Sequence, residues 1–401
     1  MEKKYSIFFA KIICGYSLID MMYGATYILL MTSIGISESK ISLLLSFSSL
    51  FLFIFDLPSG NFADIHGRKK ATSLGLIIWG IGLIGFGLSR TYWMIFMFNV
   101  VCALGVALFS GSPQAWYIDK LKEIDKYEYK NKVLPLLGGV LSVFSAVGAL
   151  MASFLNSYYN NMMFSMIICG ILSIVLGIYT FLFFEDNYGI TTNNNFLKEM
   201  LFSLKGFRND ESMKKLLIFN ILNSIPFTLF LLTWQIHSIN NLELDFSLIG
   251  IMMVVFMLVQ ALSGFLSVKL IEIITNINLT IFGVLIVVLS FIIFIFFGHI
   301  NIIYLSGLIL IEFGLGLVFN NSSAWSQDLI PSKKRSTYSS TITSVNSLLN
   351  FLTGLCLSIV LNFFEIKIAW ILACIVEFLC FWYLIIKIRP ICDEVSNGDK
   401  N

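Results

Sequence analysis

Three carboxyl groups lie inside long apolar stretches of this sequence. Asp20 is in the middle of the stretch 7–33, Glu312 is in the stretch 302–326, and Glu377 is in the stretch 367–388. A charge at the centre of a lipid bilayer costs at least about 2.5–3.5 kcal/mol, so such acids often mark an ion or substrate path. Burial favours the protonated form, which lets a carboxyl group exchange a proton near neutral pH. The acids therefore predict proton or cation chemistry inside a membrane.

The neighbours of these acids indicate what they do. Asp20 shares one helical face with three tyrosines, Tyr16, Tyr23 and Tyr27. A face that is both polar and aromatic predicts a cavity rather than lipid. Asn320 lies two turns after Glu312, on the same side of its helix. For Asp20 and Glu312 the alternatives are a coupling role or a structural hydrogen bond to another helix, whereas for Glu377 the structural role is favoured.

The stretch 215–238 is a further candidate lining of the path. Pro226 lacks a backbone N–H and frees a carbonyl group, so we expect this helix to kink. Trp234, near the predicted outer end, either contacts a ligand or, as is more usual, anchors the helix at the membrane interface. The candidate residues of the substrate or proton pathway are Asp20, Tyr16, Tyr23, Tyr27, Glu312, Asn320, Asn220, Asn223, Trp234 and Gln235.

The composition explains what must position these residues. Hydrophobic residues make up 57% of the 401 residues and charged residues 12%, and the mean hydropathy is +0.86. Soluble proteins carry about 25% charged residues, so the expected solvent is a bilayer. Windows of about 19 residues predict twelve membrane-spanning helices. They lie at 7–33, 40–62, 70–89, 92–115, 133–156, 162–184, 215–238, 246–268, 278–297, 302–326, 337–362 and 367–388.

The distribution of Lys and Arg predicts the orientation. If both termini are cytoplasmic, the inner segments hold 23 of the 26 Lys and Arg residues, and the outer segments hold Lys40, Arg90 and Lys367. Cytoplasmic loops carry an excess of these residues. We therefore expect a multi-pass protein of the plasma membrane, embedded in the lipid bilayer, with both termini in the cytoplasm.

A repeat divides the chain into two halves. The pattern Ala-Trp-x-x-Asp contains Trp116 and Asp119, and it recurs with Trp325 and Asp328 at an offset of 209 residues. Between the halves, apolar residues at helical spacing predict an amphipathic helix on the membrane surface. The predicted organisation is a six-helix half at 1–184, a linker at 185–214, a second six-helix half at 215–390 and a polar tail at 391–401.

A compact group of glycine, acidic and basic residues follows the second apolar stretch. It reads Gly60-x-x-x-Asp64-x-x-Gly67-Arg68-Lys69, preceded by Asp56-x-Pro58-Ser59. This spacing resembles the signature loop between the second and third helices of the major facilitator superfamily of secondary transporters. The preceding residues are similar to the Glu-x-Pro-Thr-Gly of a bacterial efflux-like branch. The resemblance implies an all-α membrane fold of two pseudo-symmetric six-helix halves, with helices 1, 4, 7 and 10 around the central path.

The resemblance also implies a conformational gate. It pairs Arg68 with the acid that ends the fourth helix, Asp119, and sets Asp64 against the N-terminus of the helix 337–362, where a negative charge is stabilised. Such contacts would hold the cytoplasmic side closed. The alternative is that these residues only anchor the topology. The candidate gate residues are Asp56, Gly60, Asp64, Gly67, Arg68, Asp119 and Asp328.

Other classes of protein fit the sequence less well. The seven Cys have no metal-like spacing, the three His form no set, and no phosphate-binding Gly-x4-Gly-Lys-Ser/Thr motif occurs. We therefore expect no metal, no cofactor and no enzyme activity. Drug/proton antiporters often carry an Arg in the fourth helix and a Gly-Pro pair in the fifth, and both are missing here.

The sequence thus predicts a secondary active transporter that exports a small organic or amphipathic solute in exchange for protons. We expect a monomer without a nucleic-acid partner. The runner-up is a nutrient or metabolite importer of the same fold. In another class, the alternatives are a passive channel and a membrane sensor that does not transport.

Overall fold

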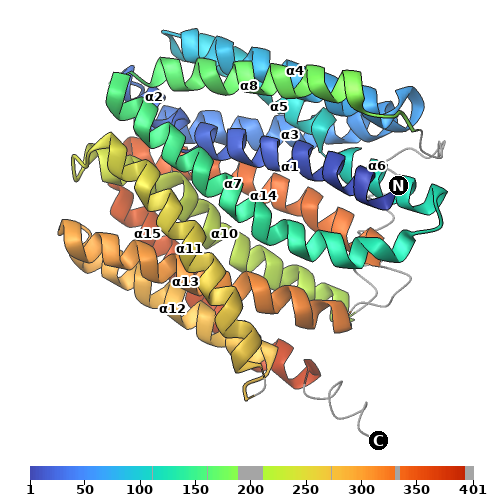
Figure 1. Cartoon of the computed structure of the whole chain (residues 1–401). Helices are drawn as coiled ribbons and strands as arrows, with labels where there is room; N and C mark the ends of the chain where they lie inside the picture. The colour runs from blue at the N-terminus through green and yellow to red at the C-terminus, as the bar shows by residue number, and fades with distance from the viewer. Residues whose placement is uncertain (111, 160, 188–210, 272, 330–334, 393–401) are drawn as a thin grey trace, which may run out of the picture. The chain divides into compact units, whose positions relative to one another are not determined.

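The computed structural model describes residues 1–110, 112–159, 161–187, 211–271, 273–329 and 335–392. In these residues all regular secondary structure is helical (Figure 1). Twelve of the described segments are long and apolar enough to cross a membrane, which confirms the predicted all-α class and the number of spans. The orientation of the termini stays a prediction. Most of the predicted linker helix (185–214) and the end of the tail (391–401) lie outside the described residues.

The chain divides into two compact units. Unit 1 is Met1–Asn193 with Leu244–Val254, and unit 2 is Asn194–Glu243 with Val255–Asn401. The helices up to residue 183 are α1 (Glu2–Gly24), α2 (Tyr27–Ser33), α3 (Glu38–His66), α4 (Arg68–Leu88), α5 (Tyr92–Phe109), α6 (Ser112–Glu123), η1 (Tyr127–Tyr129), α7 (Lys130–Tyr159) and α8 (Met162–Phe183). From residue 211 they are α10 (Glu211–Asn240), α11 (Phe246–Leu270), α12 (Asn276–Phe297), α13 (Asn301–Leu329), α14 (Arg335–Phe363), α15 (Ile366–Tyr383) and the π-helical turn η3 (Leu384–Ile388).

Glycines bring helices close together inside unit 1. The helices α4 and α8 lie side by side (Figure 1), and a side chain at Gly80 would meet the carbonyl oxygen of Gly170 at 2.5 Å. On another face of α4, a side chain at Gly75 would meet the backbone of α5, 2.7 Å from the nitrogen of Phe109. In a bilayer, helices associate through close packing of small residues rather than through hydrophobic burial. These contacts therefore hold α4 between its two neighbours.

Unit 2 repeats this packing with its own residues. A side chain at Gly314 on α13 would lie 2.9 Å from the carbonyl oxygen of Gly283 on α12, and these two helices run side by side (Figure 1). Gly314 is the counterpart of Gly105, whose α-carbon hydrogens face α4 in unit 1. The repeated Trp325 is buried and donates a hydrogen bond to Thr280 Oγ1 at 3.0 Å. The internal repeat thus recurs in helix contacts.

The first predicted helix is interrupted in the structure. The sequence predicted one span over 7–33, but α1 ends at Gly24 and α2 begins at Tyr27. The N–H of Thr26 bonds to Tyr23 O, and the Thr26 hydroxyl bonds to Met22 O at 2.8 Å. The same hydroxyl lies 3.2 Å from Ser165 Oγ on α8 and 3.3 Å from Asn156 Nδ2 on α7. Long-range polar contacts therefore hold the break, and the local sequence did not indicate it.

The prediction of one continuous helix over 92–115 was wrong. The helix α5 ends at Phe109, Ser110 leaves helical geometry with φ of −52° and ψ of 126°, and α6 runs from Ser112 to Glu123. Pro113 explains the break because it lacks the N–H that a continuous helix would bond to the carbonyl of Phe109, whereas proline is tolerated in the first turn of a new helix.

We expect Gly80→Ala to destabilise the protein by about 1–3 kcal/mol, because the added methyl group would overpack the α4–α8 contact. Thermal unfolding of the purified protein in detergent measures this effect. The matched control is Gly24→Ala, whose methyl group would find its nearest neighbour, Met253 Cε, at 3.9 Å. Equal stability of the two variants would contradict the close contact.

Candidate functional site

The junction of α3 and α4 carries the motif found in the sequence. Gly67 joins the two helices with φ of 101°, a left-handed conformation that side chains disfavour. Arg68 starts α4, and its guanidinium donates to the carboxylate of Asp119 on α6. Only 12% of the Arg68 side chain is exposed, so this charge-assisted bond lies in a largely enclosed place. The structure therefore brings together two of the predicted gate residues.

A short segment after α8 completes this junction. We call residues 184–187 the α8 strap. Asn187 O accepts a bond from the N–H of Arg68 at 3.0 Å, and Asp186 Oδ1 accepts one from the N–H of Lys69 at 3.3 Å. A carboxylate at the N-terminus of a helix satisfies free N–H groups and interacts favourably with the helix dipole. A side chain at Gly67 would lie 2.7 Å from the carboxyl carbon of Asp186, so the strap also requires glycine there.

The α8 strap also packs on Trp116 of α6. The indole stacks on Phe184 with ring centroids 3.7 Å apart, and its Nε1 donates to Glu185 O at 2.6 Å. Asn187 Nδ2 donates in return to Trp116 O at 3.2 Å. The repeated tryptophan therefore joins the end of the fourth span to the end of the sixth. Sequence reasoning missed the strap, because its partners lie about 70 to 180 residues away.

Glu185 adds a charge cluster at the same end of unit 1. Its carboxylate accepts bonds from Lys4 Nζ at 3.0 Å and from the Tyr5 hydroxyl at 3.1 Å, and Lys120 Nζ lies 3.9 Å away. The hydrogen bond from Lys4 lowers the pKa of Glu185 below its ordinary value of 4.5, with further contributions from Tyr5 and Lys120. The strap thus ties α1, α4 and α6 together.

The other predicted gate residues are only partly described. Asp56 lies half-buried on α3, and its backbone carbonyl accepts a bond from the Ser59 hydroxyl at 3.0 Å. Gly60, Asp64 and Asp328 lie in helices, but the side-chain surroundings of these three positions are outside the described part of the structure. The proposed contact of Asp64 with the start of α14 therefore stays a prediction.

Asp20 lies midway along α1, and aromatic side chains lie on the same side of the helix. Its side chain is exposed, while the predicted tyrosine face is half-buried. Tyr16 stacks on Phe109 of α5 at a centroid distance of 4.3 Å and also contacts Trp79 of α4 at 4.9 Å. Tyr23 and Tyr27 stack on each other at 4.8 Å. The structure thus gathers the predicted residues on one side of unit 1.

Glu312 on α13 is buried and hydrogen bonded. Only 6% of the residue is exposed, and its Oε2 accepts a bond from Gln260 Nε2 on α11 at 2.8 Å. Farther along the same two helices, Asn320 Nδ2 donates to Ser263 Oγ at 3.4 Å. The sequence did not single out Gln260 or Ser263. The sequence signal that could have found them is their three-residue spacing, which places both polar side chains on one face of α11.

The predicted pathway residues on α10 have different surroundings. Asn220 Nδ2 donates to the backbone of its own helix, at Leu216 O, and Asn223 lies half-buried one turn later. Trp234 and Gln235 are each 2% exposed. Trp234 packs on Phe256 of α11 at a centroid distance of 5.0 Å, inside unit 2. The interpretation of Trp234 as an interface anchor was therefore wrong, because the helix turns this residue inward.

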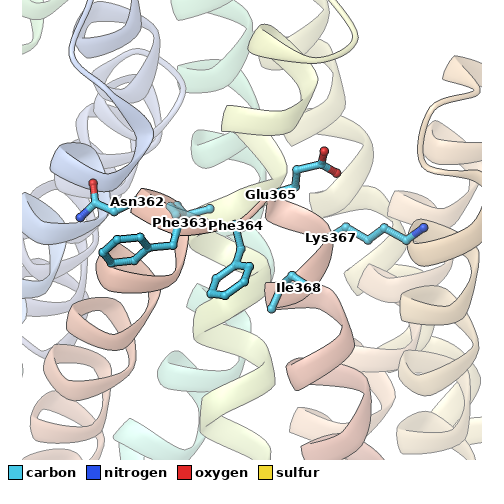
Figure 2. Close-up of a pocket in the computed structure, with 7 residues that line it drawn as sticks. Asn362, Phe363, Phe364, Glu365, Lys367 and Ile368 are labelled. Atoms are coloured by element: carbon cyan, nitrogen blue, oxygen red, sulfur yellow. The ribbon is translucent and has the colours of Figure 1, made fainter.

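A surface cavity of about 550 Å³ lies at the turn between α14 and α15 (Figure 2). Its lining includes the exposed rings of Phe363 and Phe364, with Glu365 and Lys367 beside them. No predicted site residue lines it. This cavity is formed by a single turn of the chain, so we do not take it as the functional site. We place the candidate site at the intramembrane acids and at the junction of α3 and α4.

This chain belongs to the Major Facilitator Superfamily, whose family model matches residues 12–354 and 216–398. An uncharacterized MFS-type transporter of Methanocaldococcus jannaschii is 26% identical over 107 residues. That match covers 27% of this chain and 26% of the relative, so the chain spans about a quarter of the length of the curated relative that it matches. The fold and the family make the chain a member of a class of membrane transporters.

Solved structures of transporters share the fold over nearly the whole chain. The nucleoside transporter NupG is 13% identical with a TM-score of 0.75, and the match covers 96% of this chain and 98% of NupG. A transporter of the POT family in complex with 5-aminolevulinic acid is 13% identical with a TM-score of 0.72, covering 98% and 96%. A bacterial homologue of the human lysosomal transporter Spinster, in an inward-facing and occupied conformation, is 15% identical with a TM-score of 0.70, covering 96% and 97%.

We expect Asp119→Asn to destabilise the protein by about 1–3 kcal/mol, because it removes the negative charge that accepts from the enclosed Arg68 guanidinium. Thermal unfolding measures the change. Glu123→Gln is the control on the same helix, since Glu123 pairs with Lys120 while 52% exposed and should cost less than about 1 kcal/mol. Additive losses in Arg68→Ala, Asp119→Asn and the double variant would show that the two side chains do not interact.

The lowered pKa of Glu185 predicts a pH dependence. A carboxyl group whose pKa is lower in the folded than in the unfolded chain stabilises the fold above its ordinary pKa of 4.5, and this stability is lost as the pH falls through the folded pKa. The melting temperatures of the native protein and of Glu185→Gln should therefore differ at neutral pH and converge in acid. A difference that grows in acid would contradict this assignment.

Proposed function

We propose that this protein is a secondary active transporter that carries a small organic or amphipathic solute out of the cell by alternating access, in exchange for protons. Membership of the superfamily supports the transporter class. In this proposal residues 1–184 and 215–390 are the two halves, and both termini face the cytoplasm. The protein would act as a monomer in the plasma membrane.

The observation that carries the proton coupling is the buried pair of Glu312 and Gln260. A carboxyl group in the middle of a membrane-spanning helix is costly, and it is retained chiefly for function. The amide N–H of Gln260 can bond to a carboxyl oxygen in either protonation state, because both a carboxylate and a neutral acid accept there. Glu312 can therefore take up and release a proton without losing its partner.

Asp20 supports an organic or cationic substrate. Its carboxyl group lies on the same helix face as three tyrosines, and a carboxylate beside aromatic rings attracts a positively charged group. The ion pair of Arg68 with Asp119, together with the α8 strap, would hold one end of unit 1 as a rigid body during the conformational cycle.

Deletion of the gene from the source cell tests the direction of transport. Export predicts that the deletion sensitises cells to toxic compounds, whereas import predicts that it starves them of a nutrient.

Substrates are found by thermal-shift screening of the purified protein, since a ligand that binds the native state raises its apparent stability.

We expect Asp20→Asn and Glu312→Gln each to lower transport driven by a pH gradient by about tenfold or more, since neither amide can exchange a proton. Proteoliposomes loaded with a compound from the thermal-shift screen provide the measurement. Glu365→Gln, on the exposed turn outside the spans, should leave transport unchanged. If both pathway variants retain gradient-driven transport, proton coupling through these acids is excluded.

A further inference from the structure

Glu377 is a buried acid in unit 2, and no ion pair joins it to a described cationic side chain. It lies on α15, is 1% exposed, and its Oε1 has no hydrogen-bond partner among the described residues. An ionised carboxylate buried in this way costs many kcal/mol unless a cation or several donors hold it. A neutral acid needs only one acceptor for its O–H group. The surroundings of Glu377 therefore decide which form is present.

No cationic side chain of the described neighbouring helices lies at the level of Glu377. The lysines of α10, Lys214 and Lys215, are in its first turns, and His237 is near its other end. The helix α12 carries no titratable side chain at all. The remaining titratable groups on the elements around α15 are Lys367, Cys374, Cys380 and Tyr383 on α15 itself, Lys387 on η3, Glu211 on α10, Tyr304, Glu312 and Asp328 on α13, and Arg335, Tyr338 and Cys356 on α14.

Two hydrogen bonds define the register of α15 against α10. Trp370 Nε1 donates to Thr233 Oγ1 at 3.1 Å, and the Tyr383 hydroxyl donates to Lys215 O at 3.2 Å. The two helices are therefore antiparallel. Glu377 lies near the midpoint between Trp370 and Tyr383, and the midpoint between Lys215 and Thr233 is residue 224. The acid is thus at the level of the segment 222–226 of α10.

Apolar packing also joins α10 and α15 in this region. Leu222 of α10 packs against the apolar cluster that includes Cys380, which is one turn beyond Glu377 on α15. Glu377 also lies two turns after Trp370, and therefore on the same face of α15 as the indole that bonds to α10.

The segment of α10 at this level offers acceptors that lack donors. The Oδ1 atom of Asn223 is buried and has no hydrogen-bond partner among the described residues. One turn farther, Pro226 lacks an N–H, so the carbonyl group of Leu222 loses its donor within the helix. A buried acceptor without a donor is destabilising, and such atoms are rare in folded proteins. A donor on α15 at this level could satisfy one of these acceptors.

We propose that Glu377 carries a proton and donates it in a hydrogen bond to Asn223 Oδ1, and so positions the amide of Asn223 at the kink of α10. Glu377 Oε1 and Asn223 Oδ1 can bond to each other only if one of them holds a proton, and of these two groups only the carboxyl can do so. Glu377 is thereby a positioning residue for a predicted pathway residue. This inference goes beyond the proposed function and holds whether or not transport is coupled to protons.

Infrared spectroscopy of the purified full chain tests the proton directly. The native protein should show the carbonyl stretch of a protonated carboxyl group at neutral pH, and Glu377→Gln should remove it. Asn223→Leu should shift the frequency of that band, because the acid loses its acceptor. Asn220→Leu is the control on the same helix, since Asn220 bonds to its own backbone, and it should leave the band in place. A native spectrum without a band assignable to Glu377, or a band indifferent to Asn223→Leu, would overturn the proposal.

Stability variants separate this role from simple packing. Glu377→Gln keeps an N–H donor for Asn223 and should unfold near the native temperature, whereas Glu377→Leu should unfold at a clearly lower one. The double variant Glu377→Leu with Asn223→Leu should lose less stability than the sum of the single variants, because it leaves no unpaired polar group. Equal losses for the Gln and Leu variants, or strict additivity in the double variant, would contradict the hydrogen bond. The infrared shift with Asn223→Leu remains decisive if the Glu377 variants fail to fold.

Discussion

The structure depends on the exclusion of water from the bilayer. Each backbone polar group inside the membrane must be satisfied within the chain, so the described spans are helices. The same constraint applies to polar side chains, which cross from one helix to another to find partners. Glu312 bonds to Gln260, and Thr228 bonds to Asn350 at 2.7 Å. In unit 2, these few bonds fix how the helices are rotated about their axes.

Close packing of small residues also stabilises the association of the helices. Lipid is as apolar as leucine, so burial of apolar side chains gives little preference for helix over lipid, and the backbones must approach closely to gain contact energy. Gly75 and Gly105 provide this in unit 1, and Gly283 and Gly314 provide it in unit 2. The repeat of the contact between the third and fourth spans of each half indicates that the duplicated feature is a packing surface.

Charge is concentrated where the helices leave the apolar region. At one end of unit 1, Arg68, Asp119 and Glu185 are joined by the α8 strap, which also satisfies the first N–H groups of α4. The strap directly precedes the segment that connects to α10. The α8 strap contacts the start of α4, where the superfamily motif lies.

The sequence by itself determined the twelve spans, because a helix that crosses a bilayer must show its hydropathy locally, and it determined the motif around Arg68, because that pattern is contiguous. Only the tertiary structure decided the break before Tyr27, the strap at Asp186, the partnership of Gln260 with Glu312 and the inward position of Trp234. Each of these depends on the rotation of one helix against another distant in the chain. Hydropathy does not encode that rotation, because a uniformly apolar helix has no distinct buried face.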